Sequence, residues 1–65
     1  MKTDVEQLAL CVSAEFLEMP GMRLTMPQAQ RLFGLDNDTC AEVVAILVAR
    51  SILRRQAGTI ALANS

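Results

Sequence analysis

Apolar residues recur at helical spacing at the start of the chain and predict a helix over residues 4–19. At about 100° per residue, one core-facing stripe collects Val5, Leu8, Ala9, Val12, Phe16 and Met19. Thr3 or Asp4 has a side chain suited to capping the start, and Pro20 with Gly21 ends the helix. The pattern therefore predicts a first helix with one buried face.

A second line of apolar residues lies outside that stripe. Leu10 and Leu17 are seven residues apart, so they project to nearly the same side of the helix, close to Ala14. A single exposed leucine is ordinary, but two on one line suggest a contact surface. We name Leu10, Ala14 and Leu17 the leucine strip.

Local signals predict a second helix over residues 26–33. Thr25 and Gln28 have the spacing of a capping box, and Pro27 suits the first helical turn. The inner face is predicted to contain Ala29, Leu32 and Phe33. Gly34 follows, where a left-handed residue commonly ends a helix.

A third helix is expected over residues 37–50, with Asp36 as its N-cap. Its inner stripe is predicted to be Cys40, Val43, Val44 and Leu47. Its outer face would then carry Asp38, Ala41, Glu42, Ala45 and Ala49. The third helix is thus expected to present an acidic and alanine-rich surface.

The remaining pattern predicts a short hairpin over residues 52–62. Ile60 and Leu62 alternate with small residues, and Gly58 permits a tight reversal. The segment from Met22 to Leu24 is long enough only for an extended connector or an edge strand. We therefore expect one domain over residues 1–65, mainly α with a small β-hairpin.

Composition leaves two interpretations of the apolar content open. The chain has 65 residues, of which 52% are apolar. A chain this short has a thin core, so either the core is dense or some apolar surface is reserved for a partner. Cys11 and Cys40 lie among aliphatic residues and are interpreted as small core side chains rather than as a disulfide framework.

Charge is small overall but unevenly distributed. The net charge is −1. Residues 1–49 hold seven acids and three bases, a net charge of −4, whereas residues 50–65 hold three arginines and no acid, a net charge of +3. The arginines Arg50, Arg54 and Arg55 are therefore the expected phosphate contacts.

Residue types argue against catalysis. The chain has no histidine, tyrosine or tryptophan, so its two cysteines make neither a zinc site nor a Cys–His nucleophile pair. Its three glycines are turn residues rather than a phosphate loop. We expect no enzyme activity, no cofactor and no metal. No apolar run is long enough to cross a membrane, and no export signal is apparent, so a cytoplasmic location is expected.

The segment from Leu24 to Leu62 resembles the winged helix-turn-helix of bacterial transcription regulators. The residues that carry the resemblance are Leu24-Thr25, Leu32-Phe33-Gly34-Leu35, Asp36-x-x-Thr39, Leu47, Ile52-Leu53-Arg54-Arg55 and Gly58-x-Ile60. The resemblance implies a three-helix winged helix-turn-helix fold, double-stranded DNA as the partner and a role in transcription regulation.

The resemblance also implies where DNA would be contacted. In that family the start of the third helix reaches base edges, which corresponds here to Asn37, Asp38, Ala41, Glu42 and, less directly, Ala45. Thr39 corresponds to a phosphate contact, as do the hairpin residues Arg54 and Arg55. Asp38 and Glu42 depart from the pattern, because they would face a polyanion.

Two hypotheses about function follow from these features. The first is a small DNA-associated regulator or accessory factor, working as a homodimer through the leucine strip. The second is a protein-interaction module that uses the same fold. Its acidic third helix and leucine strip would then recognise a basic or apolar surface of a partner protein.

Overall fold

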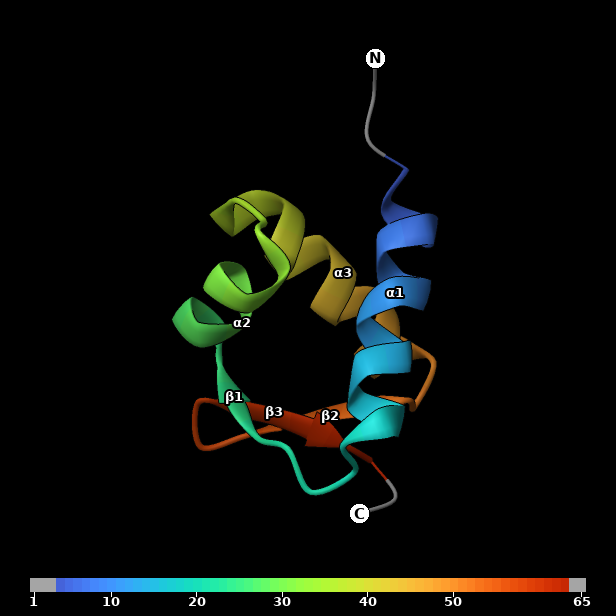
Figure 1. Cartoon of the computed structure of the whole chain (residues 1–65), viewed down its shortest axis with the longest axis vertical. Coiled ribbons are helices and arrows are strands. Elements are labelled where there is room, and N and C mark those ends of the chain that lie inside the picture. The colour runs from blue at the N-terminus through green and yellow to red at the C-terminus, as the bar shows by residue number, and fades with distance from the viewer. Residues whose placement is uncertain (1–3, 64–65) are drawn as a thin grey trace.

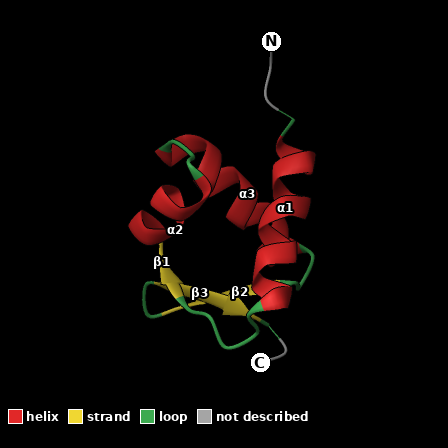
Figure 2. Cartoon of the chain, in the orientation of Figure 1, coloured by secondary structure: helices red, strands yellow, loops and turns green. Residues whose placement is uncertain are grey.

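The computed structural model describes residues 4–63 of the chain and shows three helices with a three-stranded antiparallel sheet. In chain order the elements are α1 (Val5–Glu18), β1 (Leu24–Thr25), α2 (Met26–Phe33), α3 (Asn37–Ala49), β2 (Leu53–Gln56) and β3 (Thr59–Leu62). The helices lie together above the sheet (Figures 1 and 2). The molecule is therefore mainly helical, with a small sheet that includes the expected hairpin.

Element bounds differ from the expected ones mainly at the caps. The second helix has the expected bounds of residues 26–33. The first helix is shorter than residues 4–19, because Asp4 and Met19 are its capping residues. The third helix stops at Ala49 rather than at residue 50, because Arg50 is its C-cap. Ile52 lies in the bend before β2 rather than in the hairpin.

Capping side chains fix where the first two helices begin. The Asp4 carboxylate accepts hydrogen bonds from the backbone N–H groups of Glu6 and Gln7, at 3.1 and 3.4 Å. The alternative cap, Thr3, lies outside the described residues. At α2 the capping box forms as expected: Thr25 N–H donates to Gln28 Oε1 at 2.9 Å, and Gln28 N–H donates to Thr25 Oγ1 at 3.3 Å.

The sheet has the order β1–β3–β2, so the two-residue β1 is an edge strand beside β3. Ala57 and Gly58 join β2 to β3 with positive φ angles of 54° and 81°, as a two-residue hairpin turn requires. Thr25 pairs with Thr59. This pairing brings the hairpin turn close to the start of α2, as Figure 1 shows.

One hydrophobic core joins the helices to the inner face of the sheet. α1 and α2 both pack against α3, and α3 packs against β2. The largest fully buried side chains are Phe16, Leu47, Leu53, Ile60, Val43, Val44 and Cys40. The rings of Phe16 and Phe33 lie 6.4 Å apart, which brings α1 and α2 together through their aromatic side chains. The predicted inner stripe of the third helix is thus confirmed.

Three residues expected in the core are exposed instead. Met19 is 60% exposed and Leu32 is 56% exposed. Cys11 is exposed as well. Met19 leaves the stripe because it has the non-helical φ of −128° at the end of α1. Ser13 is buried with Ala9, Val12 and Phe16 on the core side of α1, and its hydroxyl donates to the Leu10 carbonyl at 2.9 Å.

Candidate nucleic-acid interface

The turn between α2 and α3 sets the direction of the candidate reading helix. Gly34 has a φ of +67°, in the left-handed region that a side chain disfavours. Leu35 N–H then donates to the Gln30 carbonyl at 3.0 Å, which closes the end of α2. Gln30 also bridges the turn, because its Nε2 donates to Asn37 Oδ1 at 3.0 Å. These bonds hold the start of α3 against the end of α2.

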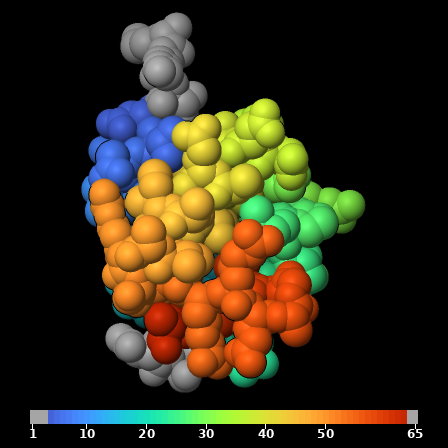
Figure 3. Space-filling model, turned by 180° about the vertical axis from the view of Figure 1, so that it is seen from behind, coloured from blue at the N-terminus to red at the C-terminus, as the bar shows by residue number. Residues whose placement is uncertain are grey.

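The outer face of α3 is exposed, as the helical pattern indicated, and its yellow to light orange atoms lie at the surface in Figure 3. The exposed positions on its first three turns are Asn37, Asp38, Ala41, Glu42 and Ala45. The Gln30 bond occupies the carbonyl half of the Asn37 amide and leaves its N–H donors for another partner. Beyond Asn37, this surface offers two carboxylates and alanine methyl groups. Its electrostatic character is therefore acidic.

Asp36 and Thr39 interact at the N-terminus of α3. Asp36 occupies the N-cap position, although its side chain does not make the expected capping hydrogen bond to the backbone. The Thr39 side chain holds the pKa of the Asp36 carboxyl below its ordinary value. Thr39 is half-buried, so only part of it is accessible for the phosphate contact that the resemblance implies.

Arg50 is engaged within the chain. Its Nη2 donates to both carboxylate oxygens of Glu6, at 2.8 and 2.9 Å, and so ties the end of α3 to the start of α1. The two side chains are 48% and 58% exposed, so this ion pair is worth little to stability. It nevertheless neutralises one of the three arginines expected to contact phosphate.

Arg54 and Arg55, the other two arginines expected to contact phosphate, lie on opposite faces of the sheet. Arg55 pairs with Ile60, whose side chain is buried under the helices, whereas Arg54 pairs with Ala61. Successive side chains on a strand point to opposite faces of a sheet. Arg55 therefore lies on the helix side of the sheet, and Arg54 lies on the outer side.

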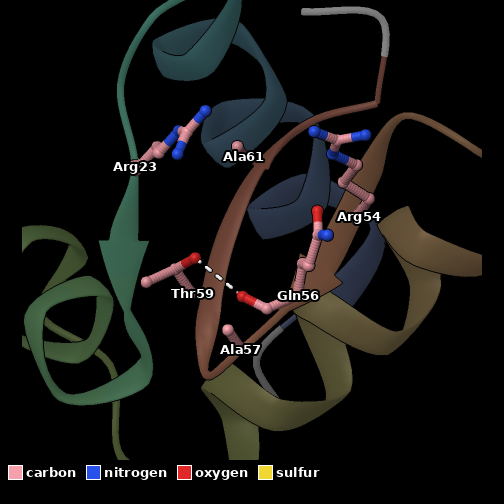
Figure 4. Close-up of a pocket in the computed structure, with 6 residues that line it drawn as sticks. All are labelled: Arg23, Arg54, Gln56, Ala57, Thr59 and Ala61. Carbon is pink, nitrogen blue, oxygen red and sulfur yellow. Dashed lines mark hydrogen bonds between the residues drawn. The ribbon is translucent and has the colours of Figure 1, made fainter.

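Arg54 instead shares an open hollow with a residue that the sequence did not single out. The hollow has a volume of about 430 Å³ and is lined by Arg23, Arg54, Gln56, Ala57, Thr59 and Ala61. These residues come from the segment before β1, from β2 and β3, and from the turn between them (Figure 4). The alternation of side chains along β2 and β3 could have placed Arg54 on the outer face of the sheet. It could not have placed Arg23 there, because that position depends on the pairing of β1 with β3.

The leucine strip on α1 is exposed. Leu10 is 60% exposed and Leu17 is 65% exposed, and Ala14 between them is exposed too. None of the three is among the buried residues of α1, which are Ala9, Val12, Ser13 and Phe16. Part of the high apolar content of the chain is therefore on the surface rather than in the core.

The two cysteines lie in different environments. Burial, followed by the nearby Asp36 charge, raises the pKa of the Cys40 thiol, which keeps it protonated and unreactive at neutral pH. Cys11 is a free thiol on the surface of α1. The interpretation as a core side chain holds for Cys40 and is wrong for Cys11.

Comparison of the chain with protein-family models, curated proteins and solved structures gave no match. Within residues 4–63, no helix has the length and apolarity needed to cross a membrane. The class of protein must therefore be argued from the order of its elements and from its surface.

Proposed function

We propose that the chain is a winged helix-turn-helix protein that binds double-stranded DNA through α3 and the hairpin. The observation that carries this proposal is topological. The order α1–β1–α2–α3–β2–β3, with β3 central in the sheet, is the order expected of a helix-turn-helix followed by a wing, and it supports the proposal. The left-handed Gly34 turn and the exposed outer face of α3 support it.

In this function the duplex lies against the first turns of α3. Asn37 has amide donors suited to a base edge, and the partly exposed Thr39 hydroxyl suits a phosphate. Arg55, on the helix side of the hairpin, supplies the phosphate contact. Asp38 and Glu42 repel the duplex, so a single domain binds weakly and with a shallow salt dependence. The protein would serve as a small regulator or accessory factor without enzyme activity.

Reversing the charge of the α3 face tests this function. Asp38→Lys with Glu42→Lys should tighten binding to a mixture of genomic DNA fragments by about tenfold and steepen the salt slope by about two. Fluorescence anisotropy at low salt measures both quantities. Glu15→Lys with Glu18→Lys is the matched control, because it changes the net charge equally on exposed positions of α1.

Two results would count against DNA binding through α3. One is the absence of any anisotropy change for the natural chain at tens of micromolar protein. The other is an equal gain in affinity from the α1 control pair, because the gain would then reflect total charge rather than contact by α3.

We also propose protein interaction as a second candidate function, favoured by the acidic α3 face together with the exposed leucine strip. A basic or apolar partner surface complements these features. The same Asp38→Lys and Glu42→Lys variant separates the two functions, because it would abolish capture of such a partner while strengthening DNA binding.

A homodimer through the leucine strip is the expected assembly in the DNA-binding function. A dimer doubles the contact with DNA and fixes the spacing of two half-sites. Leu10→Glu with Leu17→Glu should convert the dimer to a folded monomer, as measured by sedimentation equilibrium and circular dichroism. Both side chains are at least 60% exposed, so the fold should survive. A natural chain that is already monomeric at high concentration would rule out this interface.

A further inference from the structure

The outer face of the sheet brings two arginines from distant parts of the chain to the same level. Arg54 on β2 pairs directly with Ala61 on β3. On the other side of β3, Leu24 pairs with Ile60, so Arg23, one residue earlier, lies level with Ala61. Strands are about 4.8 Å apart, so the two arginine backbones are about 10 Å apart across β3. Figure 4 shows both guanidinium groups on the same side of the sheet, with Ala61 between them.

Small and polar residues form the rest of this hollow. The floor between the arginines is the Ala61 methyl group, which leaves space that a larger side chain would fill. At the end near the hairpin turn, the Thr59 hydroxyl donates to the Gln56 carbonyl at 2.9 Å. The Gln56 side-chain amide remains as a further donor beside Arg54 (Figure 4). The lining is thus rich in hydrogen-bond donors.

Among the residues that the structure describes, no acidic side chain compensates the charge of the hollow. Its lining contains two arginines and no carboxylate. Over residues 4–63 the structure shows no ion pair for Arg23 or Arg54, whereas Arg50 is paired with Glu6. An anion between two guanidinium groups that line one open space is attracted by both of them. A guanidinium presents a planar fork of donors that matches the oxygens of a phosphate.

We infer that the hollow between Arg23 and Arg54 is a binding site for a phosphate group, bridged by the two arginines and bonded by the Gln56 amide. The site lies on the outer face of the sheet, whereas α3 packs against β2 and carries the candidate DNA-contacting residues. It therefore needs neither the α3 face nor the leucine strip, and it does not depend on the proposed DNA-binding function.

Titration of the labelled natural chain with inorganic phosphate, followed by amide proton–nitrogen NMR at constant ionic strength, tests the site. Saturable shifts are expected at the amides of Gln56, Thr59 and Ala61. Arg23→Gln or Arg54→Gln should each weaken binding by about tenfold, because each removes one of the two charged donors. Arg31→Gln is the matched control. It removes the same charge from an exposed position on α2 that does not line the hollow, and it should change the affinity by less than about twofold.

Two further probes then show whether the bound phosphate group belongs to a small molecule or to a DNA backbone. Adenosine monophosphate, with adenosine as its uncharged counterpart, represents a small phosphomonoester, and a duplex with hydroxyl ends represents backbone phosphates. Arg54-dependent shifts with either probe support the site and identify its source. Shifts that do not saturate, or an Arg31→Gln effect as large as that of Arg54→Gln, would overturn it. The two arginines would then only keep the exposed strand edges soluble.

Discussion

Replacing Phe16 with alanine should lower the free energy of unfolding by about 3–5 kcal/mol and remove most of the stable folded population. Phe16 is fully buried on α1, and its ring lies 6.4 Å from that of Phe33 on α2. Truncation leaves a cavity where α1 meets the other helices. A domain of this size has a free energy of unfolding of only a few kcal/mol, so one such cavity would remove most of its stability.

The neighbouring residue provides the control for this experiment. Leu17→Ala also truncates a large apolar side chain, one position along α1, but Leu17 is 65% exposed. It should change the free energy of unfolding by less than about 0.5 kcal/mol. Urea denaturation followed by circular dichroism measures both variants. If both variants lose equal stability, or if Phe16→Ala unfolds like the natural chain, the helix packing described above would be wrong.

The elements that could be predicted from the sequence are those defined by local chemistry. The capping box of Thr25 and Gln28 fixes the start of α2 through two hydrogen bonds within four residues. The start of this helix can therefore be predicted from those four residues alone. The turn at Gly34 and the reversal at Gly58 are also local, because each needs a left-handed backbone angle. The inner stripe of α3 was predictable because its four buried residues repeat at the helical period.

The errors in the predicted core arise where an apolar residue was placed in the core because of its type rather than because of its angle around the helix axis. Cys11 projects about 120° away from the centre of the α1 stripe, so it faces solvent despite its apolar neighbours. Leu32 lies on the two-turn helix α2, where Ala29 is the fully buried side chain. Such a short helix covers only a narrow part of the core, and a leucine beside that part remains outside.

The candidate sites were predictable only where one element carries them. The exposed face of α3 and the leucine strip each follow from a single helical period. The phosphate hollow does not, because it joins Arg23 to Arg54 through a β1 strand of only two residues. Likewise, the pair between Arg50 and Glu6 spans 44 positions along the chain. Pairings over that distance depend on the packed helices and on strand register, which no local pattern encodes.

Gly34→Val should lower the free energy of unfolding by about 2 kcal/mol and loosen the connection between α2 and α3. The open space around the Gly34 Cα shows that this loss of stability would come from the backbone conformation. A Cβ at this position would meet no atom within 4 Å, so the penalty comes from the φ of +67° rather than from a clash. Valine is β-branched and tolerates this backbone region poorly.

Asparagine is the informative control at Gly34, because it enters the left-handed region more easily than other residues. Gly34→Asn should therefore retain most of the stability that Gly34→Val loses, as measured by urea denaturation. The amide signals of Gln30 and Asn37, which are bonded across this turn, should shift in the valine variant and stay close to their natural positions in the asparagine variant. If valine were tolerated as well as asparagine, the turn would not need a left-handed residue. The orientation of α3, on which the proposed DNA contact depends, would then have to be set by core packing alone.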